Sequence, residues 1–251
     1  MKKNNYSYIS IAFIILLFGI IFIPKIVNRV KDNKVVVNNE NRSKPAAKFT
    51  EEEKKASALS FIKIEGEPKK VPDFSFTNQD GKTITQEDYL GKVYVVEFFF
   101  TTCPTICPRM NRNLVSVQDV FKDNKDFGIA SFSIMPATDT PEILKAYAEN
   151  YGVTNPNWNL MTGEQEKIHA LANTGFNIYV GDVEDGELGF AHSGDFALID
   201  KNGFIRSRTD DFGNPKIFYK GIISEKEKTD EDGNKQEITM LKEDIKILLN
   251  E

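Results

Sequence analysis

The two cysteines of this 251-residue chain lie in Thr101-Thr102-Cys103-Pro104-Thr105-Ile106-Cys107-Pro108-Arg109-Met110. This stretch follows Val93 to Phe100, an apolar run in which Glu97 is the one charged residue. A run of that length, rich in β-branched and aromatic residues, predicts a buried central strand. The prolines fit the first turn of a helix, where a missing N–H costs little. The sequence therefore predicts a central strand, then the two cysteines, then a helix.

The spacing of the cysteines indicates their chemistry. Cys103 and Cys107 are four residues apart, so one helical turn would place their Cβ atoms about 5–6 Å apart on one face. That separation suits a disulfide, and it equally suits two thiolates that bind one metal ion. The partial positive charge of a helix N-terminus is expected to lower a cysteine pKa there. A disulfide that closes so short a loop stabilises a domain little, so we expect redox chemistry, metal binding or both.

The N-terminus carries an apolar segment. Residues 6–23 contain no charged side chain and end at Pro24. At about 1.5 Å rise per residue, this helix would just span a bilayer core. A signal peptide has a shorter apolar region that ends in small residues, and Ile21-Phe22-Ile23 does not fit that pattern. We predict an uncleaved membrane anchor over residues 1–24. Lysines flank both ends and leave the orientation open, whereas the cysteine pair favours an exported domain.

The remaining chain divides by composition. Residues 25–70 are polar and rich in Lys, Asn and Glu, which predicts a tether, and residues 71–251 are expected to form the folded domain. The net charge of −5, without a basic patch, argues against nucleic acid as a partner.

Strand and helix patterns alternate within residues 71–251. Period-two alternation and apolar runs predict strands at 73–77, 83–85, 93–100, 128–134, 158–161, 196–199 and 204–207. Helical spacing and capping residues predict helices over 85–90, 110–121, 140–151, 162–172 and 238–248. The expected caps are Thr85 with Asp88, Thr140 before Pro141, and Thr162 with Gln165. The expected buried faces include Met110, Leu114 and Val117 in one helix and Leu241, Ile245 and Leu248 in another. This order predicts an α/β fold with a central sheet. His169 falls on the 162–172 helix, where a surface or boundary position is expected.

Several motifs together resemble the Sco/SenC family over roughly residues 71–210. They are Asp73-Phe74-Ser75-Phe76, Asp80-Gly81-Lys82, Gly91 to Phe99, Cys103-Pro104-x-x-Cys107-Pro108, Ser133-x-x-Pro136-x-x-Asp139-Thr140-Pro141-Glu142, and His192-Ser193 before Phe196 to Asp200. The resemblance implies a thioredoxin-like fold with a central mixed sheet flanked by helices. It also implies a membrane-anchored, exported domain that handles copper for cytochrome c oxidase assembly, with Cys103, Cys107 and His192 as the copper ligands.

Two thiolates and an imidazole form a soft ligand set that suits copper, with zinc as an alternative. In a thioredoxin-like sheet, the loop before strand 196–199 faces the cysteines, which is where His192 lies. We therefore expect a copper chaperone that passes copper to a respiratory oxidase subunit or another copper client by ligand exchange. Because a Cys103–Cys107 disulfide would compete with the metal, a thiol reductant protein is an expected partner.

Other functions fit the pattern less well. A thiol–disulfide reductase that acts on cysteines of an exported client is the main alternative. Thioredoxin-type enzymes normally have Cys-x-x-Cys, one residue shorter than the spacing here, and peroxiredoxins have Thr-x-x-Cys. A structural or docking role predicts instead that serine at both cysteine positions leaves function intact.

The chain departs from the family pattern at two positions. Met135 and Ala191 stand where family members usually have aspartate. Both changes remove negative charge near the expected metal, which disfavours Cu²⁺ more than Cu⁺. We hypothesise that the protein favours Cu⁺ and that the Met135 thioether lies near the site.

Overall fold

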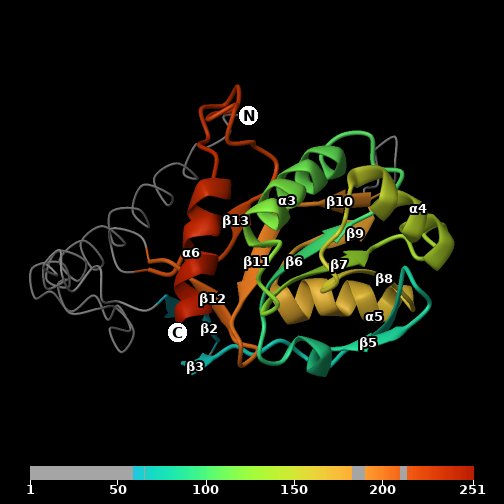
Figure 1. Cartoon of the computed structure of the whole chain (residues 1–251), viewed down its shortest axis with the longest axis horizontal. Coiled ribbons are helices and arrows are strands. Elements are labelled where there is room, and N and C mark those ends of the chain that lie inside the picture. The colour runs from blue at the N-terminus through green and yellow to red at the C-terminus, as the bar shows by residue number, and fades with distance from the viewer. Residues whose placement is uncertain (1–58, 65, 183–189, 210–213) are drawn as a thin grey trace, which may run out of the picture. The chain divides into compact units, whose positions relative to one another are not determined.

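A computed structural model describes residues 59–64, 66–182, 190–209 and 214–251 of the chain (Figure 1). Its main sheet has the strand order β1-β12-β11-β6-β7-β8-β4-β5, and β13 pairs separately with β11. The strands are β1 (Ser60–Phe61), β4 (Ser75–Asn78), β5 (Thr83–Thr85), β6 (Val93–Phe99), β7 (Phe127–Ser133), β8 (Trp158–Thr162), β11 (Asp195–Ile199), β12 (Ile205–Ser207) and β13 (Tyr219–Lys220). Two small hairpins add β2 (Lys63–Ile64) with β3 (Glu67–Pro68), and β9 (Val180–Asp182) with β10 (Phe190–His192).

The helices occupy the segments between these strands. They are the 3-10 turn η1 (Gln86–Tyr89), α3 (Cys107–Phe121), α4 (Pro141–Tyr151), α5 (Gln165–Ala170), the π-helical η2 (Leu171–Phe176) and α6 (Ile238–Asn250). The predicted faces of two of them are confirmed, because Met110, Leu114 and Val117 of α3 and Leu241, Ile245 and Leu248 of α6 are all buried. Helix α3 also packs against both α4 and α6.

Parallel and antiparallel pairs are combined in the main sheet. Strand β6 pairs in parallel with β7, and β7 in parallel with β8, whereas β11 runs antiparallel to β6 and β4 antiparallel to β8. Every residue of β6 and β7 is buried, as expected for central strands covered on both faces. The predicted mixed sheet flanked by helices is therefore confirmed.

Two neighbouring phenylalanines of β6 show how the helices cover the sheet. Successive side chains on a strand point to opposite faces. The Phe99 ring lies 5.5 Å from the Tyr147 ring of α4, and the Phe98 ring lies 5.7 Å from the Phe176 ring of η2. Helix α4 and η2 therefore cover opposite faces, and the layers enclose an aromatic core around Phe132.

Capping residues set two of the predicted helix boundaries. Thr85 and Asp88 form the expected capping box at η1. Thr140 caps α4 by accepting a hydrogen bond from the Ile143 N–H, Pro141 occupies its first turn, and Gly152 ends it in the left-handed conformation. A different boundary was predicted wrongly: α5 begins at Gln165 after Glu164, because Thr162 is still paired in β8 and cannot cap the helix.

The folded part of the chain begins before the expected boundary at residue 71. Leu59 and Ile62 are buried, and β1 pairs with β12 through Ser60–Ser207 and Phe61–Arg206. This edge strand has only two residues, so it gives no alternation to detect in the sequence. The expected anchor at 1–24 and most of the tether lie outside the described residues. In the part that is described, no helix is both long and apolar enough to cross a membrane.

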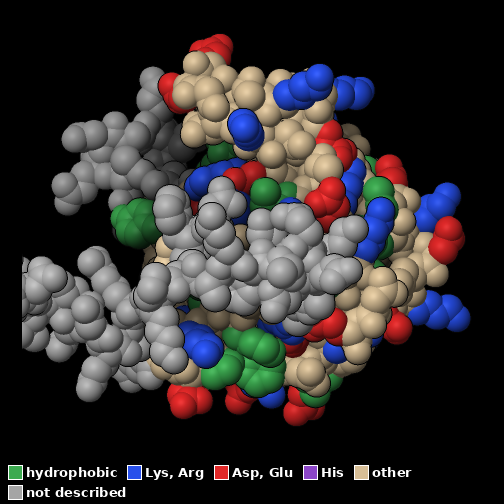
Figure 2. Space-filling view, turned by 90° about the vertical axis from the view of Figure 1, so that its left-hand side faces the viewer, with side chains coloured by type: hydrophobic (Ala, Val, Ile, Leu, Met, Phe, Trp, Pro, Cys, Tyr) green, Lys and Arg blue, Asp and Glu red, His purple; other side chains and the backbone are tan. Residues whose placement is uncertain are grey.

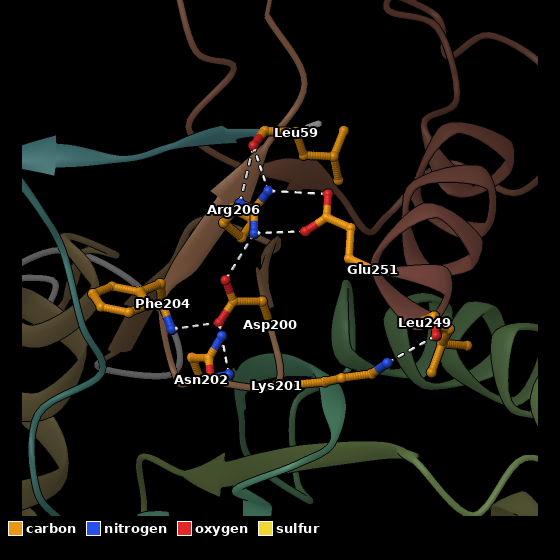
Figure 3. A network of polar contacts seen from close by, with 8 residues as sticks. All are labelled: Leu59, Asp200, Lys201, Asn202, Phe204, Arg206, Leu249 and Glu251. Carbon is orange, nitrogen blue, oxygen red and sulfur yellow. Dashed lines mark hydrogen bonds and ion pairs between the residues drawn. The ribbon is translucent and has the colours of Figure 1, made fainter. Parts of the chain in front are cut away.

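Arg206 on β12 links Leu59, just before β1, to Glu251 at the end of α6 (Figure 3). Its Nε and Nη2 donate to the Leu59 carbonyl oxygen at 3.0 and 2.6 Å. Its Nη1 donates to Asp200 at 2.8 Å and to Glu251 at 3.0 Å. The Arg206 and Asp200 side chains are almost fully buried. Removal of either one would leave the other as a buried charge without its ion-pair partner, which is destabilising.

The surface drawn in Figure 2 mixes charges of both signs. Lysine and arginine side chains lie among aspartate and glutamate side chains over the described part of this face. Such mixing is typical of a solvent-exposed domain surface.

Candidate functional site

The cysteines follow the C-terminal end of β6, as the sequence predicts. The helical turn was placed wrongly, however, because α3 begins at Cys107 and Cys103 lies in the preceding loop. Pro108 occupies the first turn of the helix. The Cys103 N–H donates to the Phe100 carbonyl oxygen at 3.3 Å, which folds the loop back onto the end of β6. Cys103 therefore lies in the loop after β6 and Cys107 at the start of α3, and the two meet near the C-terminal end of β6.

Both side chains are thiols in a buried position. Cys103 is 6% exposed and Cys107 has no exposed surface. The Cys103 Sγ lies 3.7 Å from the Thr105 Oγ1. Cys103 is therefore slightly more accessible than Cys107.

The Cys107 thiol is held in its protonated form. Burial raises the pKa of Cys107 far above its ordinary value, a hydrogen bond with Cys103 raises it further, and the Phe100 backbone opposes both effects. The lowered pKa expected from the helix N-terminus was wrong for this residue. A helix terminus stabilises a nearby charge by only about 0.3–1 kcal/mol, which corresponds to less than about one pKa unit. Full burial can shift a pKa by about 3–5 units in the opposite direction. A metal or another electrophile must therefore displace this proton.

Glu97 lies on β6, six residues before Cys103, and has no exposed surface. Its Oε1 accepts a 2.6 Å hydrogen bond from Ser131 Oγ, which in turn accepts one from Trp158 Nε1 at 2.9 Å. Burial raises the pKa of Glu97 to about 7, and the Ser131 bond partly offsets this. The sequence shows the charge in the strand, but its contact with Ser131 depends on the pairing of β6 with β7.

Asn111 connects Cys107 to helix α4. Its Nδ2 donates to the Cys107 carbonyl oxygen at 3.0 Å and to the Tyr147 hydroxyl at 3.1 Å. Asn111 has no exposed surface, so these bonds form in an environment where they are strong. The first turn of α3 is thereby fixed against α4.

The loop after His192 lies against the cysteine segment. His192 ends β10, opposite Val180 of β9. Two residues later, Gly194 has φ +68, and a Cβ there would lie 2.4 Å from the Ile222 Cδ1 and 3.5 Å from the Ile106 Cδ1. Since Ile106 directly precedes Cys107, the fold brings the backbone of the His192 loop to the start of α3.

Hydrogen bonds hold this loop in place. The Gly194 carbonyl oxygen accepts from the Gly221 N–H at 2.9 Å, and the Gly221 carbonyl oxygen accepts from Asn113 Nδ2 at 2.8 Å. Lys220 also pairs with Asp195 at 2.7 Å. The chain from Tyr219 to Gly221 therefore bridges α3 and the His192 loop, a contact between segments about a hundred residues apart that the sequence does not reveal.

Four other residues were considered in the sequence analysis: His169, Met135, Ala191 and His192. His169 is half-buried, with Nε2 3.0 Å from the Ile134 carbonyl oxygen, which confirms the predicted boundary position. Met135 is half-buried on the loop after β7. The side chains of Ala191 and His192 lie outside those that the structure describes. Among the described side chains, no three His, Cys, Asp or Glu residues form a metal-binding group, so the expected third ligand stays a prediction.

Comparisons with known proteins place this geometry in a family. The SCO1/SenC family model matches residues 63–226. The SCO1 protein homolog of Bacillus subtilis is 38% identical over 54% of this chain and 70% of its own length. The structure of BsSco, described as having a disulfide switch and as a member of the Sco family of cytochrome c oxidase assembly proteins, is 29% identical, with a TM-score of 0.56, over 72% of this chain and 94% of its own.

A third comparison concerns the fold alone. The copper-bound structure of Arabidopsis thaliana ScoI is 23% identical, with a TM-score of 0.53, over 72% of this chain and 99% of its own. Its likeness agrees with the layered sheet and helices described above. The family model covers well over half of the chain and includes both cysteines, His192 and the β6–α3 junction. The chain belongs to the SCO1/SenC family.

Proposed function

We propose that this protein binds Cu⁺ through Cys103, Cys107 and His192 and delivers it to a cytochrome c oxidase subunit. The observation that carries the proposal is the meeting of two buried thiols with the His192 loop at the end of β6. Two thiolates and an imidazole match the ligand preference of Cu⁺. The similarity to BsSco, a member of a family of cytochrome c oxidase assembly proteins, supports the same assignment.

Copper uptake depends on the protonation of the two thiols. Copper displaces the protons of both cysteines, because the thiolate is the ligand. At Cys107 this means removing a proton from a thiol whose pKa burial raises. The bound ion is then released when a client thiol or imidazole replaces the ligands in turn. Cys103, the more exposed cysteine, is the first ligand that a client exchanges.

The N-terminal segment fits delivery at a membrane. Residues 6–23 are long and apolar enough to anchor the chain. We propose that the domain is exported and works on the outer face of that membrane, beside membrane-bound oxidase subunits.

A second candidate is thiol–disulfide reduction, which the disulfide switch of BsSco favours. Here the Cys103 thiolate attacks a client disulfide, and one client sulfur leaves as a thiolate. Cys107 then attacks the mixed disulfide and releases the second client sulfur. The client gains two electrons and the two thiol protons, and a Cys103–Cys107 disulfide remains for a reductant protein to reduce.

One experiment separates the two candidates. In a bacterial strain that lacks its own Sco protein, the full chain should restore cytochrome c oxidase activity, and the Cys103→Ser, Cys107→Ser double variant should not. Excess copper should rescue the double variant if delivery is the function. Rescue by an added small thiol, with no effect of copper, would instead establish reduction. Full activity of the double variant would exclude both.

A further inference from the structure

The loops that follow β6 and β7 lie side by side at the cysteine end of the sheet. Phe99 of β6 is paired with Ser133 of β7, and the Ile134 N–H donates to the Phe99 carbonyl oxygen at 2.8 Å. The first loop leads to Cys103 and the second to Asp139. Asp139 has no exposed surface, although an aspartate is almost never fully buried without partners.

The Asp139 carboxylate binds both loops. Its Oδ2 accepts from the Thr101 N–H at 3.0 Å and from Ser133 Oγ at 2.5 Å. Its Oδ1 accepts from Thr101 Oγ1 at 2.5 Å, and the Thr138 hydroxyl lies 3.4 Å from it. Hydrogen bonds to a carboxylate are among the strong ones in proteins. Thr101, two residues before Cys103, is therefore fixed at both its backbone and its side chain.

Asp139 is itself held rigidly. Its N–H donates to the Met135 carbonyl oxygen at 3.0 Å, and the next residue, Thr140, caps α4. A carboxylate on so constrained a segment has little freedom to follow a moving partner. The start of the cysteine loop must therefore conform to Asp139.

The same helix also reaches the other end of the cysteine pair. Two turns into α4, the Tyr147 hydroxyl accepts from Asn111, and Asn111 also donates to the Cys107 carbonyl oxygen. The α4 segment thus contacts Thr101 through Asp139. It also contacts Asn111 through Tyr147, and Asn111 in turn bonds to the Cys107 backbone.

We propose that Asp139 is a positioning residue that sets the geometry of the Cys103–Cys107 pair, and thereby both its copper affinity and its dithiol–disulfide equilibrium. The copper part of this inference rests on the proposed function. The disulfide part depends only on the two thiols being present. Residues that support metal ligands typically change metal affinity by about 10–100-fold when they are replaced.

A structural role alone is the competing explanation, and the chain offers a matched control for it. Asp200 is also buried, at 5% exposure, and it accepts from the Asn202 and Phe204 N–H groups and from Arg206. It follows Ile199, which pairs with Tyr94 near the start of β6, so it lies at the end of the strand away from the cysteines. Replacement of either aspartate removes a buried, multiply bonded carboxylate.

The test compares Asp139→Asn and Asp200→Asn in the full-length protein. Thermal unfolding measures stability, competition with a chromogenic Cu⁺ chelator measures copper affinity, and equilibration in glutathione buffers measures the dithiol–disulfide equilibrium. Both variants should lose stability. Asp139→Asn should also weaken copper binding about tenfold or more and shift the thiol equilibrium, while Asp200→Asn should leave both within twofold of the wild type.

Two outcomes would overturn the proposal. In one, Asp139→Asn unfolds at a lower temperature but keeps the wild-type copper affinity and thiol equilibrium. In the other, Asp200→Asn changes both as much. If Asp139→Asn does not fold, Thr101→Val removes only the hydroxyl contact and should give a smaller change in the same direction, and its absence counts against the proposal. If the wild type binds no copper, the proposed function fails, and the thiol equilibrium alone then decides the role of Asp139.

Discussion

The N–H of Gly221 donates to the carbonyl oxygen of Gly194 at 2.9 Å, two residues beyond His192. Through Gly221 the loop is tied to Asn113 on α3, the helix that Cys107 begins. The expected third ligand and the cysteine pair therefore have a common support. A substitution at Gly194 should consequently change the copper affinity.

Gly194→Ala should weaken copper binding as well as stability. Gly194 has φ +68, and an added Cβ would lie 2.4 Å from the Ile222 Cδ1. The left-handed backbone alone costs about 1 kcal/mol for alanine, and the contact displaces the loop from Ile222. Copper affinity is measured by chelator competition and stability by urea denaturation.

Gly81→Ala is the matched control, because Gly81 has φ +73 and a Cβ there would meet nothing within 4 Å. It should lose only the backbone cost of about 1 kcal/mol, without the steric contact, and bind copper normally. Equal copper affinity in the two alanine variants would show that the loop after His192 does not support the metal.

Glu97→Gln should remove a pH dependence from the stability of the metal-free, reduced protein. The pKa of Glu97 rises from 4.5 to about 7 on burial, so the unfolded chain releases this proton at lower pH than the folded protein. Stability from this group is complete below pH 4.5 and falls as the pH rises to about 7, by about 3 kcal/mol in total.

Urea denaturation of the wild type and Glu97→Gln at pH 5 and pH 8 tests this. Other groups titrate alike in both proteins, so the difference between them isolates Glu97. The variant should gain stability relative to the wild type at pH 8. An identical loss in both proteins between the two pH values would mean that Glu97 is ionised in the folded state throughout.

Met135→Leu tests the hypothesis that a thioether lies near the metal. Met135 is half-buried on the loop after β7, and Met240 on α6 is half-buried as well. If sulfur contacts the ion, Met135→Leu should lower the Cu⁺ affinity and change the X-ray absorption spectrum of the metal. Met240→Leu should do neither. Unchanged affinity and spectrum in Met135→Leu exclude the contact.

Local sequence signals predicted much of the fold. The apolar run around Glu97 gave the central strand, the Thr85–Asp88 spacing gave the capping box, and Thr140-Pro141 gave the start of α4. Each of these signals depends on residues within one strand or one helical turn. Errors arose where pairing between distant segments decides the outcome, as for the edge strand at Ser60 and the start of α5.

For the candidate site, the sequence indicates which residue types could bind metal, but not how they are buried or which distant residues they contact. Cysteine spacing and the resemblance predict Cys103, Cys107 and His192 as the ligands, and that set stays a prediction. Protonation of Cys107 could not be predicted, because it depends on the depth of burial. Nor could the hydrogen bond between Asp139 and Thr101, which lie 38 residues apart. Contacts of that kind are set by the parallel pairing of β6 and β7.

Copper stoichiometry of the full-length, fully reduced protein tests the central claim most directly. The wild type should bind one Cu⁺ tightly, His192→Ala should bind it more weakly, and the Cys103→Ser, Cys107→Ser double variant should bind none. Oxidation of the wild type to the disulfide should also abolish uptake, because the disulfide removes both thiolate ligands. A wild type that binds no copper while its thiols remain reactive, or a double variant that binds copper normally, would contradict the account.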